Sequence, residues 1–286
     1  MVSTASFFTR TRRQQTNYAW TLSVLTSGTP AQRTHAAQTF ATMMMWRLME
    51  GVPDIFALWQ RRAVGAHAPQ TAGASSLAPA TAAEAGRITP FIQLTFGLPS
   101  APLPDNHAEG IVGEYLWWLH ASEATNPQTP LLRIEGPDAQ VTSQGGDGLT
   151  VHRDLATNQL FFRLWESKKQ TSARSISATT RTAFNQLNAK AQRYLAQMSG
   201  LALKESDAEI AALMAQMVGH WADRATQASA GFSISTGARP RRAFTAAPTH
   251  FPWLAAFPHG LEGVVTSIPN YAAFVAEVRA YVWSAL

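Results

Sequence analysis

The stretch GGDGLTVHRDLATNQLFFRLWESKK, residues 145–169, decides the fold expected for this chain. Residues 149–155 and 159–169 are predicted to be strands, and the short segment 156–158 between them predicts a hairpin turn. In such a hairpin Asp147, at the start of one strand, lies roughly opposite Glu166, near the end of its partner. Lys168 follows Glu166 by two residues and therefore projects to the same face. The stretch predicts two acids and one lysine gathered at one end of a β-ribbon.

These side chains suit the binding of a divalent metal. Magnesium prefers hard oxygen ligands, keeps several waters and takes only one or two protein carboxylates, which Asp147 and Glu166 can supply. The ammonium of Lys168 can orient an attacking water and stabilise the negative charge that builds on phosphorus. Glu166 follows the apolar run FFRLW (161–165), where a charge is costly unless it is paired or bound to a metal.

The pattern resembles the PD-(D/E)xK nuclease superfamily, because Asp147 is followed nineteen positions later by Glu166-Ser167-Lys168. The resemblance covers about residues 106–200, a motif-level match. It implies an α/β fold of restriction-endonuclease type, with a mixed central sheet flanked by helices. In that family an acid on the preceding helix often completes the site; Glu114 is the matching candidate and Glu109 the alternate.

The activity implied by the resemblance is cleavage of DNA with Mg²⁺ or Mn²⁺. Asp147, Glu166 and Glu114 would hold the ion, and Lys168 would position the nucleophile. More loosely, the stretch is similar to nucleases of bacterial anti-phage systems, such as the Hachiman nuclease subunit. Because the chain has no Walker-type phosphate-binding loop and no sequence-reading motif, the resemblance implies a partner helicase or other NTPase.

The chain departs from the family pattern at one ligand position. The literal Pro-Asp dipeptide is Pro137-Asp138, whereas Asp147 is preceded by Gly146. We prefer Asp147 because the flanking glycines let the backbone approach a metal closely, and because Asp138 lies well before the strand. The alternative for Asp147 is an ordinary turn residue between glycines. The Gln-x-x-x-Tyr helix motif of the RecB-like branch is absent.

A modest basic excess permits a nucleic-acid partner. The formal net charge is +5 and the pI is near 9.9, which favours attraction to phosphate. The basic and polar groups after the hairpin could contact the phosphate backbone, although a solvated helix face or loop would explain them nearly as well. The candidate nucleic-acid-binding residues are Lys169, Gln186, Lys190, Arg239, Arg241 and Arg242.

The remaining pattern predicts two regions. Residues 1–85 are expected to be an N-terminal helical region, with helices over 32–63 broken near Pro53, followed by a flexible linker over 64–86. Residues 86–286 are expected to form the nuclease-like domain. Its predicted strands are 88–98, 131–136, 232–236 and 263–268, beside the hairpin. Its predicted helices are 106–121, 177–199, 206–228 and 270–285, which together give an α/β or α+β class.

Several classes are excluded or disfavoured. The chain has no cysteine, which removes disulfides and thiolate chemistry and fits a reducing, cytoplasmic setting. No apolar run reaches the length of a membrane helix, and we identify no signal peptide. Three alternatives remain open: a catalytically inactive relative that binds DNA, a structural subunit of a larger complex, and an RNA substrate.

Overall fold

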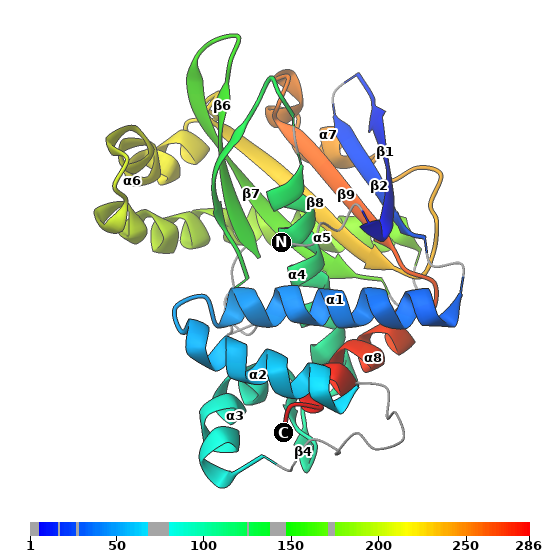
Figure 1. The fold of residues 1–286 in the computed structure, drawn as a ribbon. Coiled ribbons are helices and arrows are strands. Elements are labelled where there is room, and N and C mark those ends of the chain that lie inside the picture. Colours follow the sequence, from blue (N-terminus) through cyan, green and yellow to red (C-terminus); the bar gives the residue numbers. More distant parts are fainter. Residues whose placement is uncertain are drawn as a thin grey trace.

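A curled sheet of mixed strand direction forms the upper part of the molecule in Figure 1, with helices on both of its faces. The computed structural model describes residues 6–16, 18–26, 29–67, 80–124, 126–137, 147–170 and 175–286. In sheet order its strands are β1 (Phe8–Gln14), β2 (Ala19–Leu25), β9 (Leu261–Ser267), β8 (Ala228–Thr236), β7 (Gln159–Lys169), β6 (Gly148–Asp154) and β5 (Leu131–Glu135). The α/β class predicted from the sequence is confirmed, while the likeness to restriction endonucleases remains a proposal.

The middle of the sheet is parallel. Strands β2, β9, β8 and β7 run in the same direction, whereas β1, β6 and β5 are antiparallel to their neighbours. Every residue of β8 is buried, as expected for a central parallel strand covered on both faces. The carboxyl ends of β7, β8 and β9 therefore meet at one edge, which is a frequent location of ligand sites in such sheets.

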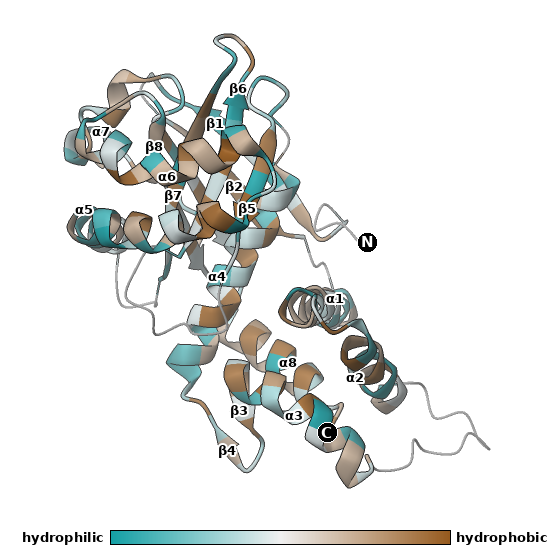
Figure 2. Cartoon of the chain, turned by 90° about the vertical axis from the view of Figure 1, so that its left-hand side faces the viewer, coloured by the Kyte–Doolittle hydropathy of each residue, from teal (hydrophilic) through white to brown (hydrophobic). Residues whose placement is uncertain are grey.

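Helices cover the two faces with different partners. On one face, α5 and α6 pack on Phe162, Leu164 and Phe232; on the other, α4 packs against Trp165. Figure 2 shows α4 reaching from the sheet to the group formed by α1, α2, α3 and α8. The longer helices are α1 (Pro30–Leu48), α2 (Pro53–Ala66), α3 (Ala82–Phe96), α4 (Asp105–Glu123), α5 (Ile176–Ser199), α6 (Ala208–Ala222) and α8 (Tyr271–Trp283).

Short elements complete the chain. A 3₁₀ turn, η2, follows α5, and in the segment that contains α7 and η3, the η3 turn packs against β8. Their bounds are β3 (Gly97–Leu98), β4 (Ala101–Pro102), η2 (Gly200–Lys204), α7 (Ala247–His250) and η3 (Leu254–Ala256). Among the described residues, no helix combines the length and the apolar character that crossing a membrane requires.

The predicted hairpin is present as β6 and β7. The turn between them contains Asn158 in the left-handed region, at φ 55°, a conformation that asparagine tolerates better than most residues. The ladder pairs Asp154 with Gln159 at the turn and Gly148 with Trp165 at the far end. A short turn fixes this register, and the register decides which side chains meet at the open end of the hairpin.

The strand predicted over 88–98 is wrong, because most of this stretch belongs to α3. The helix begins with a capping box in which Thr81 and Glu84 satisfy each other's backbone N–H groups. Ile88, Ile92 and Phe96 recur at intervals of four residues and are fully buried. A short run rich in β-branched and aromatic residues fits a strand or a buried helix equally well, and burial of one helical face decided the outcome.

The N-terminal region contains strands as well as the predicted helices. Helices α1 and α2 confirm the helical prediction for 32–63, but β1 and β2 were not predicted. Strand β2 pairs in parallel with β9 from the far end of the chain, and Phe8 and Leu25 join the core that α1 and α8 share. The division of the chain into 1–85 and 86–286 remains a prediction.

Candidate active site

The hairpin brings Asp147 and Glu166 opposite each other. Gly148 pairs with Trp165, so Asp147, one residue earlier, lies across from Glu166. The Asp147 N–H donates to the Trp165 carbonyl at 2.8 Å, which extends the ladder by one step. The Asp147 carboxylate accepts a hydrogen bond from the backbone N–H of Ser167. Two acids that are distant in sequence therefore lie at the open end of one β-ribbon.

Asp147, Glu166 and Glu114, with Lys168 and Lys190 beside them, are called the acidic cluster. Glu166 is almost fully buried, since only 1% of it is exposed. One carboxylate oxygen accepts a hydrogen bond from the Lys168 ammonium. The other oxygen, Oε2, is buried and has no hydrogen-bond partner among the described residues. Burial, reinforced by the charge of Asp147, raises the pKa of Glu166 to about 8. A buried acceptor without a donor is costly, and a cation could relieve that cost.

Glu114 approaches the pair from α4. Burial raises the pKa of Glu114 well above its usual value, and the charges of Asp147 and Glu166 raise it further. The alternate acid, Glu109, is paired with the ammonium of Lys169 instead. The electrostatic coupling therefore favours Glu114 over Glu109 as the third acid of this cluster.

Two lysines offset part of this negative charge. Burial alone would lower the pKa of Lys168, but the surrounding carboxylates raise it overall, so its ammonium stays protonated at neutral pH. Lys190 on α5 lies close enough to lower the pKa values of Asp147 and Glu166, against the larger effect of burial. Gln186, one turn earlier on α5, is partly buried. Three carboxylates thus face two ammonium groups, leaving one negative charge uncompensated when all are ionised.

The cluster fits a metal ion in part. Its buried, unpartnered Glu166 oxygen and its excess of carboxylates suit a hard cation such as Mg²⁺. Within the described ranges, however, no set of three or more His, Asp or Glu side chains converges closely enough to hold a metal directly. Asp147 and Glu166 are the pair best placed to do so, with Glu114 reaching the ion directly or through water. The alternative acid Asp138 lies outside the described residues.

The predicted nucleic-acid-binding residues have different partners in the structure. Lys169 is engaged by Glu109 and also donates to the Asn106 carbonyl at 2.9 Å. The arginines of residues 239–242 follow β8 and are exposed, and the Arg241 carbonyl accepts from Arg13 on β1 at 3.2 Å. Along the described chain, no interaction links Arg239, Arg241 or Arg242 to the acidic cluster. Only Lys190 of this set lies beside the acids, so the binding roles of all six residues remain predictions.

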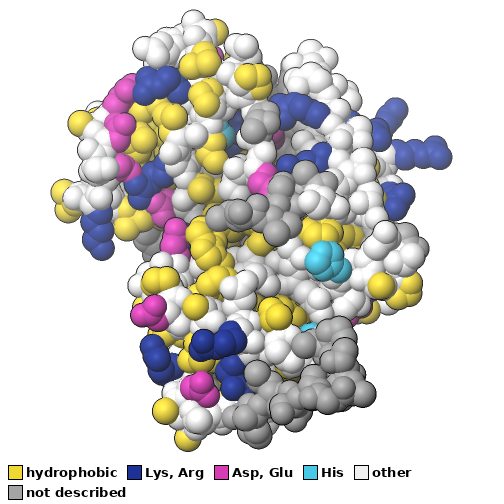
Figure 3. Space-filling model, viewed as in Figure 1, with side chains coloured by type: hydrophobic (Ala, Val, Ile, Leu, Met, Phe, Trp, Pro, Cys, Tyr) yellow, Lys and Arg dark blue, Asp and Glu magenta, His cyan; other side chains and the backbone are white. Residues whose placement is uncertain are grey.

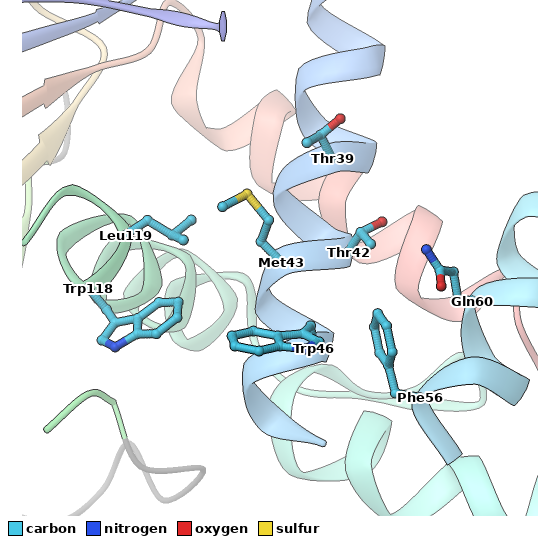
Figure 4. A pocket seen from close by; sticks show the side chains of 8 residues that line it. All are labelled: Thr39, Thr42, Met43, Trp46, Phe56, Gln60, Trp118 and Leu119. Atoms are coloured by element: carbon cyan, nitrogen blue, oxygen red, sulfur yellow. The ribbon is translucent and has the colours of Figure 1, made fainter. Parts of the chain in front are cut away.

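Two further pockets help to delimit the site. The pocket in Figure 4, of about 470 Å³, lies between α1, α2 and α4 and has a mostly apolar lining that includes Trp46, Phe56 and Trp118. No residue of the acidic cluster lines this pocket. A second pocket, of about 660 Å³, lies at the carboxyl edge of the sheet and includes Glu109, the partner of Lys169. No residue of the acidic cluster lines this second pocket either.

Sequence reasoning missed two contributions to the site. The backbone N–H of Ser167 holds Asp147, and a main-chain donor leaves no signal in the identity of a residue. Lys190 was expected to contact nucleic acid, but its proximity to Asp147 and Glu166 depends on how α5 packs over β7. Its spacing after Lys168 carries no such information.

No protein-family model matches this chain, and no curated protein matches it either. Assignment to the PD-(D/E)xK nucleases therefore remains a prediction from the motif residues of the sequence.

Proposed function

We propose that this chain is a metal-dependent DNA endonuclease with a site of the PD-(D/E)xK type. The observation that carries the proposal is Glu166, buried with one unpartnered carboxylate oxygen, opposite Asp147 and two residues before Lys168. Burying an acid in an apolar strand has a clear energetic cost. A bound cation would compensate the charge of the buried carboxylate. Acids with perturbed pKa values that cluster in one place are also common in active sites.

In the proposed reaction each residue has a distinct task. Asp147 and Glu166 would hold Mg²⁺ or Mn²⁺, and Glu114 would reach the ion directly or through water. Such an ion would act as a Lewis acid on the phosphodiester and lower the pKa of a bound water. The Lys168 ammonium, held by Glu166, would orient the attacking water and stabilise the charge on the phosphoryl oxygens. Lys190 would provide a second positive charge beside the phosphate.

The proposed setting follows from the resemblance. The substrate would be DNA, and the partner would be a helicase or other NTPase that delivers the substrate and controls cleavage. We therefore propose a bacterial phage-defence system as the setting, with this chain as its nuclease effector. The pocket beside Glu109, at the carboxyl edge of the sheet, would receive a part of the nucleic-acid strand that lies away from the scissile phosphate.

Cleavage of supercoiled plasmid DNA with Mg²⁺ or Mn²⁺ tests the proposal. Replacing Glu166 or Lys168 by alanine should reduce the rate by about 100-fold or more, because each removes a preorganised charge at the reacting phosphate. Glu50→Ala and Lys204→Ala are matched controls on exposed positions and should leave the rate unchanged. Equal cleavage by wild type and by the Glu166 and Lys168 variants would rule out the assigned site.

A second candidate is a catalytically inactive relative that binds DNA or serves as a structural subunit of a larger complex. Two features favour it: the described acids do not converge as a three-residue metal set, and Lys168 already occupies one oxygen of Glu166. Calorimetry with Mn²⁺ separates the candidates. An active site should bind the ion in wild type and lose it in Glu166→Gln, whereas an inactive relative should show no uptake. Absence of DNA binding at every salt concentration would favour a structural role, since phosphate contacts strengthen as salt is lowered.

A further inference from the structure

A pocket of about 250 Å³, lined by several charged and polar residues, lies at the C-terminal end of α4, and none of the acidic cluster's residues lines it. Arg163 and Trp165 line it from β7, and because side chains alternate along a strand they face away from Glu166. Arg10 and Arg12 line it from β1. Figure 3 shows Arg and Lys side chains meeting Asp and Glu side chains in the area between the β1–β2 and β6–β7 hairpins.

Among the described residues that line this pocket, three are arginines and two are glutamates, a formal excess of one positive charge. Arg10 pairs with Glu123 at 2.7 Å. Arg12 pairs with Glu262 at 3.0 Å, and Arg163 pairs with the same carboxylate. Three guanidinium groups are therefore matched by two carboxylates. Arg12 is the most exposed of the three arginines, since 49% of its side chain is exposed. Its side chain can therefore move to contact a ligand at the mouth of the pocket.

Two buried donors in the pocket lack acceptors. Arg10 donates to Nδ1 of His120 at 3.0 Å, and because a guanidinium has only donors, the proton of the neutral ring must be on Nε2. Burial, together with the charge of Arg10, lowers the pKa of His120 to about 3, so the ring is neutral at physiological pH. The Nε2–H of His120 and the Nε–H of Arg163 have no partner among the described residues, although these residues are only 4% and 5% exposed.

Not every buried ring nitrogen in the pocket lacks a hydrogen-bond partner, as His152 shows. Both of its ring nitrogens are engaged, by the Thr129 carbonyl at 3.3 Å and by the Thr150 hydroxyl at 2.9 Å. The unsatisfied atoms lining the pocket from His120 and Arg163 are both donors, and buried donors normally find an acceptor. A ligand that fits must therefore bring acceptor oxygens, and the excess positive charge favours anionic ones.

We propose that this pocket binds a small organic oxyanion, a metabolite bearing a phosphate or a carboxylate. His120 Nε2 and Arg163 Nε would donate to its oxygens, and Arg12 would close over it. The volume of about 250 Å³ equals the share of roughly eight water molecules in the liquid, which leaves room for more than the anionic group. The site is independent of the proposed nuclease chemistry, because it lies on the other face of β7.

Isothermal titration calorimetry of the full chain with inorganic phosphate and, separately, with acetate tests this inference, at constant ionic strength and without metal or DNA. Wild type should bind at least one of the two anions, and the tighter binder identifies the oxyanion. His120→Phe keeps the ring and its packing on Phe8 but removes the donor, and should weaken binding about tenfold, the usual effect of losing a hydrogen bond to a charged group.

Arg12→Met provides a second variant at a half-exposed position, which keeps the test valid if His120→Phe folds poorly, and it should also weaken binding about tenfold. Arg33→Met is the matched control, because Arg33 is an ion-paired arginine on α1 that does not line the pocket. Equal binding by wild type, His120→Phe and Arg12→Met would place the anion elsewhere and overturn the inference. Absence of binding by wild type up to tens of millimolar of either anion, a level far weaker than specific recognition, would also overturn it, leaving water as the occupant.

Discussion

Glu166 combines near-complete burial with a carboxylate oxygen that accepts no hydrogen bond from the described residues. Its partner across the ladder, Asp147, accepts a hydrogen bond from a backbone amide. Among the described residues, Lys168 is the only lysine that donates a hydrogen bond to the Glu166 carboxylate. Each of these residues is individually ordinary. Their burial in one place makes the acids reluctant to ionise, which has measurable consequences for stability and for metal binding.

The first prediction concerns the pH dependence of stability without metal. Glu166 has a pKa of about 8 in the folded protein and near 4.5 in the unfolded chain. Between these values the folded state holds a proton that the unfolded state has released, so the free energy of unfolding falls as pH rises through this window. Glu166→Gln lacks this titration and should be more stable than wild type at pH 8 by about 1–3 kcal/mol.

Urea denaturation in EDTA at pH 5 and pH 8 measures the difference. The gap between Glu166→Gln and wild type should be small at pH 5 and should widen at pH 8. Glu50→Gln, on an exposed carboxylate, should show no such widening. A gap that does not change with pH would mean that Glu166 is ionised throughout and adequately paired by Lys168.

The second prediction concerns metal affinity. A divalent ion must displace the proton from Glu166 before it can bind. The Mn²⁺ dissociation constant should therefore fall by about tenfold for each pH unit from 6 towards 8, and should level off above the pKa of Glu166. Calorimetry in buffers of different ionisation enthalpy would measure the released proton directly. Affinity that is flat with pH, with no proton release, would contradict the assignment.

Among the secondary-structure elements, the contact of α4 with the hairpin holds Glu114 near the two strand acids. Trp117 and Trp118 of α4 are buried, and Trp117 packs against Trp165 with ring centroids 5.6 Å apart. Gly148 lies directly beneath this indole, so that an added Cβ would come within 1.9 Å of Trp117. The glycine at the start of β6 therefore permits the close approach of helix and strand.

The third prediction follows from that contact. Gly148→Ala should destabilise the protein by about 1–3 kcal/mol, because the buried indole must move to accommodate the methyl group. It should also weaken Mn²⁺ binding, since Asp147 is the adjacent residue. Gly219→Ala is the matched control: its added Cβ meets nothing within 4 Å on α6, and it should stabilise by about 0.5–1 kcal/mol. Thermal unfolding of both variants checks the pair, and a neutral Gly148→Ala would show that the indole moves freely.

Across the whole molecule, the two ends of the chain are joined through the sheet and the helices. Strand β2 is hydrogen-bonded to β9, the Trp59 indole donates to the Val282 carbonyl at 3.2 Å, and the Arg62 guanidinium donates to the Ala285 carbonyl at 2.9 Å. Residues on both sides of position 85 share one core. From these contacts we expect the N-terminal region to fold together with the part of the chain that contains the acids.

The fourth prediction is that a chain of residues 86–286 does not fold cooperatively. The shorter chain lacks β1, β2, α1 and α2, so β9 and the apolar face of α8 would be uncovered. Exposed strand edges and large apolar surfaces favour aggregation. Circular dichroism melting and size-exclusion chromatography should show a broad transition and aggregates, against a single sharp transition for the full chain. A sharp melt of the shorter chain at the same temperature would instead support a separate domain beginning near residue 86.

The sequence by itself determined the hairpin and what it carries. A short turn joins two strands that are adjacent in the chain, so the register follows from local geometry and places Asp147 across from Glu166. Helical periodicity likewise predicted α1, α2, α4 and α5, because each element's own amphipathic or apolar pattern is visible within one window.

Tertiary structure decided what depends on contacts between distant segments. The identity of α3 followed from burial of Ile88, Ile92 and Phe96, and strands β1 and β2 acquired their place through pairing with β9. The approach of Glu114 and Lys190 to the hairpin acids depends on how α4 and α5 pack on opposite faces of the sheet. Periodicity within one window carries no information about which elements pack together, so the third acid and the second lysine gained their positions only from the complete fold.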